Sequence, residues 1–172
     1  MKSLSQAVIA VCAGGVLLAV AGCGGPAGQT PDPESQTQGL EQLDPCGIFT
    51  DDDLQAFGLE GPGSPETGIA SEPGCYYNGD RTAVVVYKNQ EQTVEAYGQQ
   101  SNWAKFDALT VDGRKAASAI DKTATQARIC STLFDAGGGS IIVDVSESRD
   151  QGLDECAESQ KIAEAIAPRM PR

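Results

Sequence analysis

The sequence contains no histidine, and this absence excludes several kinds of enzyme. Without imidazole there is no Ser-His-Asp triad and no Cys-His pair, so the common nucleophilic hydrolases are excluded. There is also no Cys-x-x-Cys pair, whereas tetrahedral zinc sites use closely spaced thiolates or imidazoles. We therefore expect no zinc centre and no other cofactor, and the sequence favours a protein that is not an enzyme.

Serines, glycines and aspartates occur only in incomplete versions of catalytic or binding motifs. Ser64 in GPGSPET and Ser140 in GGGSII lack the second glycine of a nucleophile elbow. No lysine follows the glycine run at residues 137–139, so a hairpin turn is favoured over a phosphate-binding loop. The aspartates at residues 51–53 fit no calcium-binding loop, and the helix dipole explains them as the first turn of a helix.

Basic residues are scarce: the chain has 12 Lys and Arg against 24 Asp and Glu, and its formal charge is −12. Binding of nucleic acid depends on a basic surface that neutralises phosphates, so we expect no nucleic-acid partner. An acidic surface is also repelled by anionic lipid headgroups. The charge therefore favours a domain held away from the bilayer over one that lies on it.

The longest apolar run stands at the amino terminus, in MKSLSQAVIAVCAGGVLLAVAGC. One basic residue, Lys2, followed by about fifteen uncharged and mostly apolar residues is typical of an export signal. No Lys or Arg follows the run directly, which disfavours a permanent membrane span. Residues 20–23, VAGC, resemble the bacterial lipobox, which implies that Cys23 carries a diacylglycerol thioether and begins the mature protein. The alternative is an ordinary signal peptide cut near the same alanines.

This interpretation divides the chain into a lipoprotein signal peptide (1–22), a lipidated flexible linker (23–43) and one extracytoplasmic domain (44–172). Two or three fatty chains, such as palmitate, bind a membrane more firmly than the single chain that gives marginal binding. We therefore expect the mature protein to be anchored through Cys23 to the outer face of the bacterial cytoplasmic membrane. Its 11 basic and 24 acidic residues then give it a formal charge of −13.

Four cysteines remain in the expected domain: Cys46, Cys75, Cys130 and Cys156. An even number of cysteines in an exported chain predicts two disulfides. Four cysteines allow three pairings. We prefer Cys46 with Cys75 and Cys130 with Cys156, because each pair would join a predicted helix to the neighbouring hairpin.

Hydrophobic periodicity predicts an α+β domain, with an antiparallel sheet of about four to five strands from two hairpins, covered by two to three helices. The hairpins are predicted in CYYNGDRTAVVVYKN and ARICSTLFDAGGGSIIVDVS, and a further strand follows a turn at Asp112 and Gly113. The helices are predicted in LDPCGIFTDDDLQAFG, NQEQTVEAYGQQSNWAKF and LDECAESQKIAEAIAPRM. The helices are expected to cover one face of the sheet.

Capping residues mark the ends of the first two predicted helices. Thr50 and Asp53 have the spacing of a capping box, and Gly58 is placed to end the first helix. Asn89 with Gln92 is the expected reciprocal cap of the second helix.

The cysteine context resembles a known family. DPCGIFTDDDLQAFG, GCYY before a hairpin, ARICSTLFDAGGGSIIVDVS and a last Asp-x-Cys helix are similar to a family of uncharacterised four-cysteine lipoprotein domains of actinobacteria. The resemblance spans about residues 44–167 and implies a localisation and a fold, but no biochemical role. The family usually has Asp-Pro-Cys at the last helix, where this chain has Glu155 in place of the proline.

Three functions fit these observations. The first is a non-enzymatic, lipid-anchored domain that binds or scaffolds an envelope protein, a peptide or a cell-wall component. Its tentative binding surface is formed by Tyr76, Tyr77 and Trp103, because aromatic side chains with polar edges are typical binding anchors; core packing is the alternative for each of them. The second is a carrier or sensor of a small amphipathic ligand, held between sheet and helices. The third is an enzyme that uses a pair of carboxylates, such as a glycosidase.

Overall fold

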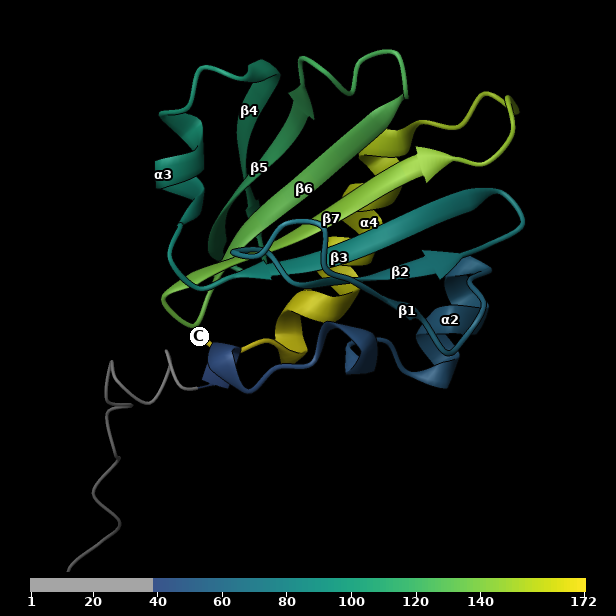
Figure 1. The fold of residues 1–172 in the computed structure, drawn as a ribbon, viewed down its shortest axis with the longest axis horizontal. Helices are drawn as coiled ribbons and strands as arrows, with labels where there is room; N and C mark the ends of the chain where they lie inside the picture. Colours follow the sequence, from purple (N-terminus) through teal and green to yellow (C-terminus); the bar gives the residue numbers. More distant parts are fainter. Residues whose placement is uncertain (1–38) are drawn as a thin grey trace, which may run out of the picture. The chain divides into compact units, whose positions relative to one another are not determined.

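The computed structural model describes residues 39–172, so the expected signal peptide, Cys23 and most of the expected linker lie outside the described residues. Within residues 39–172 the chain forms a seven-stranded antiparallel sheet in the spatial order β1-β2-β3-β7-β6-β5-β4 (Figure 1). The strands are β1 (Ser64–Glu66), β2 (Gly74–Asn78), β3 (Thr82–Asn89), β4 (Trp103–Val111), β5 (Arg114–Asp121), β6 (Ile129–Ala136) and β7 (Gly139–Glu147). The predicted antiparallel sheet is confirmed, but the predicted four to five strands were too few.

The two additional strands are the two edges of the sheet. β1 lies in the Gly- and Pro-rich loop and pairs with β2 over three residues. β4 begins at Trp103, within the segment predicted as one helix over residues 89–106, and continues beyond it; only α3 (Val94–Gly98) of that segment is helical. The pairing of β4 with β5 satisfies the backbone of this segment and overrides its helical spacing.

Helix caps agree with the sequence in the first helix and differ in the second. α2 (Asp51–Phe57) begins with the expected capping box of Thr50 and Asp53 and ends at Gly58, whose φ is 63°. α3 instead begins after Thr93, whose side chain accepts a hydrogen bond from the Ala96 amide. The last helix, α4 (Glu155–Ile166), is capped by Asp154 and continues into the short 3-10 helix η2 (Ala167–Arg169). None of the helices between residues 39 and 172 is long and apolar enough to cross a membrane.

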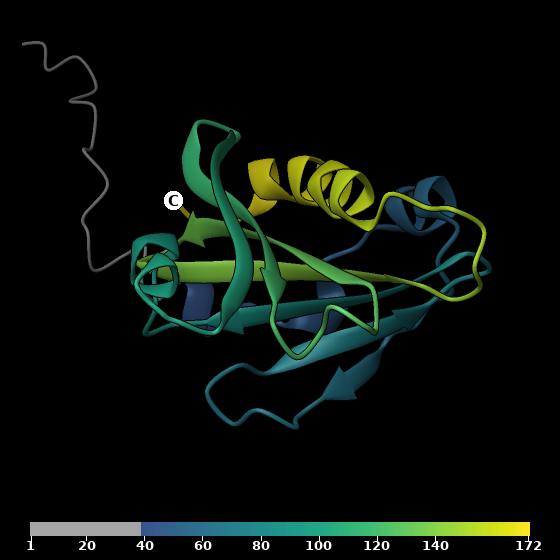
Figure 2. The same ribbon diagram turned by 90° about the horizontal axis from the view of Figure 1, so that it is seen from above.

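α4 packs across one face of the sheet, on β6 and β7, and this layer holds the main core (Figure 2). Alternate residues of β7 reach this core: Ile141, Val143 and Val145 are fully buried there. α2 packs against the same core through partly buried Leu54 and Phe57.

Two disulfides fasten the helical segments to the sheet. Cys46, in the short 3-10 helix η1 (Pro45–Gly47), is bonded to Cys75 of β2, and Cys130 of β6 is bonded to Cys156 of α4. These are the two pairs preferred from the sequence.

Two nearly buried cations hold the two ends of the described chain. The Lys88 ammonium donates to the carbonyl oxygens of Leu40, Glu41 and Leu43 at 2.7 to 3.3 Å. Leu40 is fully buried, so residues 39–43, which were expected to be linker, pack against the domain. Arg114 holds the other end by donating to carbonyl oxygens of the C-terminal segment, those of Ala167, Met170 and Pro171.

The opposite face of the sheet is not left bare, contrary to the expectation that helices cover one face. α3 packs there on β5 and β6, and Val94 and Tyr97 join Leu133 and Ile142 in a second cluster of buried side chains. Because neighbouring residues of a strand point to opposite faces, Leu133 and Ile142 face α3 while the adjacent Phe134 and Ile141 face α4.

Candidate ligand-binding site

A pocket of about 250 Å³ opens on the α3 face, which we call the α3-face pocket. Its floor comes from the centre of the sheet, and its walls come from α3, the strand that follows it and the β1–β2 loop. The lining residues are Ile69, Glu72, Tyr87, Tyr97, Gln100, Asn102, Trp103, Asp121, Ser131, Leu133, Ile142 and Asp144. No Lys or Arg is among them.

Strand register sets the floor in two rows. Tyr87 of β3, Ile142 of β7 and Leu133 of β6 are direct cross-strand neighbours, and they form an apolar row. Two residues along, Asp144 of β7 lies opposite Ser131 of β6. Side chains alternate between the two faces along β7, so the Asp144 carboxyl group lies on the same face as this apolar row. The apolar residues of β7 contribute their side chains to the buried core.

Asp144 has the most perturbed carboxyl among the described residues. Its Oδ1 atom is buried and accepts no hydrogen bond within residues 39–172. Burial raises the pKa of Asp144 to about 6, with a further increase from the negative charges of Glu72 and Asp121; the adjacent Ser131 hydroxyl opposes this shift. No Lys or Arg lines the pocket, so this carboxyl group has no cationic partner there.

The walls are held rigid by side-chain hydrogen bonds. The Tyr97 hydroxyl donates to Glu72, and the buried Asn89 amide donates to Glu72 at 3.0 Å and to the Tyr97 oxygen at 2.9 Å. The Trp103 indole donates to the Tyr97 carbonyl at 2.7 Å, and the Tyr97 and Trp103 ring centroids are 6.2 Å apart. This network fixes both aromatic rings before any ligand arrives.

The phenol groups of the pocket stay neutral at physiological pH. Burial and the nearby carboxylates of Asp144, Glu66 and Glu72 raise the pKa of Tyr87 to about 12. Burial and the hydrogen bond to Glu72 raise the pKa of Tyr97 well above its ordinary value. The two tyrosines therefore present uncharged rings and hydroxyls to the pocket.

Asp121 stands at the rim and remains charged. Its carboxylate accepts hydrogen bonds from the Thr123 hydroxyl and amide at 2.5 and 2.7 Å, and from the Asn102 side chain at 2.7 Å. These bonds, with the Thr123 hydroxyl the largest contribution, lower the pKa of Asp121. The pocket thus combines a charged carboxylate at its rim with a buried one on its floor.

The structure does not bring together the three aromatic residues proposed from the sequence. Trp103 lines the α3-face pocket. Tyr76 is on the same face but is two strands away from Asp144, where it is 38% exposed. Tyr77, its neighbour, points to the opposite face, where it is buried against Phe49 and donates to a backbone carbonyl. A continuous surface of Tyr76, Tyr77 and Trp103 does not exist.

The other groups of the pocket, including Glu72, Tyr87, Tyr97 and Asp144, were not predicted from the sequence. One of them had a local signal, because Asp144 interrupts the apolar run SIIVDVS at a position that alternation places away from the main core. The other residues come from separate elements, and only the sheet order places them side by side.

Comparison with known proteins then assigns the chain to a family. A family model described as "Protein of unknown function (DUF3558)" matches residues 18–169. The chain belongs to the DUF3558 family. No curated protein and no solved structure matches it. The family description gives no activity, so the function of this DUF3558 chain must be argued from its pocket.

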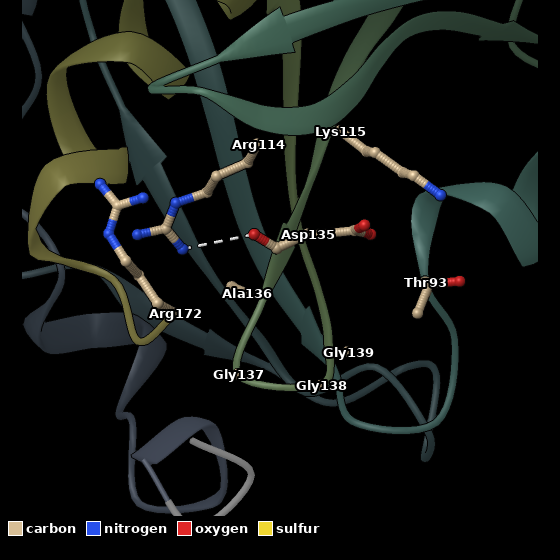
Figure 3. A pocket seen from close by; sticks show the side chains of 9 residues that line it. All are labelled: Thr93, Arg114, Lys115, Asp135, Ala136, Gly137, Gly138, Gly139 and Arg172. Carbon is tan, nitrogen blue, oxygen red and sulfur yellow. Dashed lines mark hydrogen bonds between the residues drawn. The ribbon is translucent and has the colours of Figure 1, made fainter. Parts of the chain in front are cut away.

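A second pocket of the DUF3558 chain, of about 360 Å³, lies at the β6–β7 turn and carries three cations (Figure 3). Each of these cations is already engaged. Arg114 donates to the Asp135 carbonyl and to the C-terminal carbonyls, Lys115 pairs with Glu95 at 2.9 Å, and Arg172 pairs with Asp112 at 2.9 Å. The cations of this pocket are therefore already paired within the chain, and the α3-face pocket is the better candidate site.

Proposed function

We propose that this chain is a non-enzymatic, lipid-anchored domain of the bacterial cell envelope that binds a small ligand in the α3-face pocket. Cys23 holds it on the outer face of the cytoplasmic membrane, and the domain carries or senses the ligand there. The lipobox-like VAGC, the four paired cysteines and the lack of histidine support the location and the non-enzymatic role.

The observation that carries the ligand-binding role is the carboxyl group of Asp144 on the floor of the pocket, whose buried Oδ1 atom accepts no hydrogen bond within residues 39–172. A carboxylate with a buried oxygen that accepts no hydrogen bond destabilises the fold, and a position needed only for packing is better filled by Ser, Val or Ile. Departures from packing rules of this kind are typical of functional sites. The pocket favours a small ligand over an extended protein surface, because the expected aromatic surface is divided between the two faces.

The ligand-binding role is tested by amide chemical-shift mapping on the full chain in detergent micelles, with a set of neutral, anionic and cationic small molecules. We expect at least one class to shift the amides of Tyr87, Trp103 and Asp144 while those of residues 137–139, in the second pocket, stay unchanged. The proposal fails if no class shifts the amides of the α3-face pocket.

The anchor is tested separately with Cys23→Ala. We expect the wild-type chain to sediment with membranes and to carry the mass of an acylated cysteine, whereas the variant is not acylated and is recovered in the soluble extract or as uncleaved precursor. A wild-type chain whose Cys23 is unmodified would refute the anchored location without affecting the pocket.

A further inference from the structure

We propose that the ligand of the α3-face pocket is an organic monocation, an amine or guanidinium on a short apolar stem, whose charged nitrogen pairs with the carboxylate of Asp144. This inference rests on the ligand-binding function proposed above and names its ligand class. Four features of the pocket support it: its charge, the unpartnered oxygen, the aromatic walls and the volume.

The first feature is charge of one sign. Three carboxyl groups, those of Glu72, Asp121 and Asp144, line the pocket, and no Lys or Arg lines it. A low-dielectric site with this charge attracts a cation and repels an anion much more strongly than open solvent does. These charges disfavour an anionic ligand. A neutral ligand would gain no electrostatic attraction from the carboxylates of Glu72 and Asp121.

The second feature is the oxygen without a partner. Oδ1 of Asp144 is buried, and no donor within residues 39–172 reaches it. An ammonium group on the pocket side of this carboxylate supplies a donor and the opposite charge, and hydrogen bonds between charged groups are about twice as strong as neutral ones. A hydroxyl group of a neutral ligand supplies the donor only.

The third feature is the surface that surrounds the carboxyl groups. Tyr87, Tyr97 and Trp103 offer aromatic rings, to whose faces alkylammonium and guanidinium groups are attracted, and Leu133 and Ile142 offer an apolar surface for the stem. A metal ion does not fit, because within residues 39–172 no group of three His, Cys, Asp or Glu lies close enough to hold one. The cation is therefore organic.

The fourth feature is size. A volume of about 250 Å³ corresponds to about eight water molecules at roughly 30 Å³ each, which is below the usual range for drug-sized ligands. The pocket accepts one amine on a stem of a few carbons. Such a group is carried by a free small amine and by a lysine side chain of a peptide, and the test below separates these two sources.

Binding of a cation at Asp144 requires the charged carboxylate, so it competes with protonation. The ionisable groups that face Asp144 are Glu72 from the β1–β2 loop, Asp121 from the end of β5, and the phenols of Tyr87 and Tyr97. The pKa of Asp144 is about 6, so its carboxyl group is mostly ionised at pH 7 and mostly protonated at pH 5. Affinity for an amine is therefore expected to fall about tenfold between pH 7 and pH 5.

Trp103 provides the readout, because it is the only tryptophan of the chain and it lines the pocket. The full chain in micelles is titrated at pH 7.5 with n-hexylamine, 1-hexanol and hexanoate, which share a stem and differ in charge, while Trp103 fluorescence is recorded. We expect hexylamine to bind at least tenfold more tightly than hexanol and hexanoate not to bind. Nα-acetyl-lysine amide is the peptide probe: binding comparable to hexylamine indicates a lysine side chain, and hexylamine binding alone indicates a free amine.

Asp144→Asn keeps the shape of the side chain and removes its charge, so we expect it to lose at least tenfold in hexylamine affinity and to lose the pH dependence. Asp107→Asn, at an exposed position of β4, is the matched control and is expected to bind as wild type.

The inference is overturned if hexanol or hexanoate binds as tightly as hexylamine, if none of the probes changes the fluorescence, or if Asp144→Asn binds hexylamine like wild type. Should the variant fail to fold, the pH profile of the wild type decides. In each of these cases the chemical-shift screen separately decides whether the pocket binds any ligand.

Discussion

Asp144→Asn also makes a quantitative prediction about stability. Folding raises the pKa of Asp144 from 3.8 to about 6, chiefly through burial, which is roughly two pKa units. Each unit corresponds to about 1.4 kcal/mol, so ionised Asp144 lowers the free energy of unfolding by about 3 kcal/mol. This is a large fraction of the ~5 to 15 kcal/mol that a domain of this size has.

The direction of the pH dependence follows from linkage. The folded state holds the Asp144 proton more tightly than the unfolded state, so the stabilising contribution of this group is complete below pH 3.8 and is lost as the pH rises through about 6. The asparagine variant has no such group. Because the unfolded carboxyl is already more than half ionised at pH 4, the wild type should lose slightly less than the full contribution of this group, roughly 2 kcal/mol, relative to the variant between pH 4 and pH 7.

The assay is urea unfolding of both proteins at several pH values from 4 to 8, with disulfides intact and Trp103 fluorescence as the probe. The difference between the two free energies of unfolding isolates Asp144 from the many other carboxyl groups, whose titration is common to both chains. Asp107→Asn provides the control for a surface carboxyl. A wild-type minus variant difference that stays constant across this pH range would refute the assignment of Asp144 as a buried, unpaired carboxyl.

Three further variants test the fold. Replacing Cys130 and Cys156 with Ala opens a loop of 26 residues and should lower the free energy of unfolding by about 3.5 kcal/mol in urea. Arg114→Met leaves the C-terminal carbonyls without a donor, so a loss of about 3 kcal/mol is expected, with faster hydrogen exchange in residues 167–171. Gly139→Ala would place a Cβ atom 2.0 Å from the Asn89 carbonyl oxygen; we expect a loss of at least about 2 kcal/mol and a weaker β3–β7 pairing in amide exchange.

Controls accompany these variants. Gly113→Ala meets no neighbouring atom but has φ of 73°, so it should lose only about 1 kcal/mol. Arg114→Lys keeps the charge but not the fork of donors, and it should recover part of the stability lost in Arg114→Met. If Gly139→Ala is as stable as Gly113→Ala, the close approach of the β6–β7 turn to β3 is wrong. If Arg114→Met unfolds like wild type, the C-terminus is held by other contacts.

Two features that stabilise the ends of the described chain were invisible in the sequence. From the sequence, Lys88 is interpreted as an outward-facing residue at the polar end of a strand. Arg114 is interpreted as a charged residue that follows a turn. Both are 8% exposed because each donates several hydrogen bonds to carbonyl groups of a segment distant in sequence. A lone basic residue carries no sign of such partners until the sheet order is known.

The sequence by itself determined those parts of the protein that depend on neighbours within a few residues. The Thr50–Asp53 capping box, the left-handed Gly58, the turn at Asp112 and Gly113 and the amphipathic α4 all follow from local hydrogen bonds and side-chain spacing. The even number of cysteines in the domain also indicated two disulfides, although their partners are distant in sequence.

The tertiary structure alone decided where β4 begins, that β1 pairs with β2, and what the α3-face pocket contains. Residues 103–106 belong to a segment with helical spacing, yet pairing with β5 stabilises them more as a strand. The pocket gathers Glu72, Trp103 and Asp144 from three distant segments. Its chemistry depends on strand order and register, which arise from the free energy of burying the whole sheet and which no short stretch of sequence encodes.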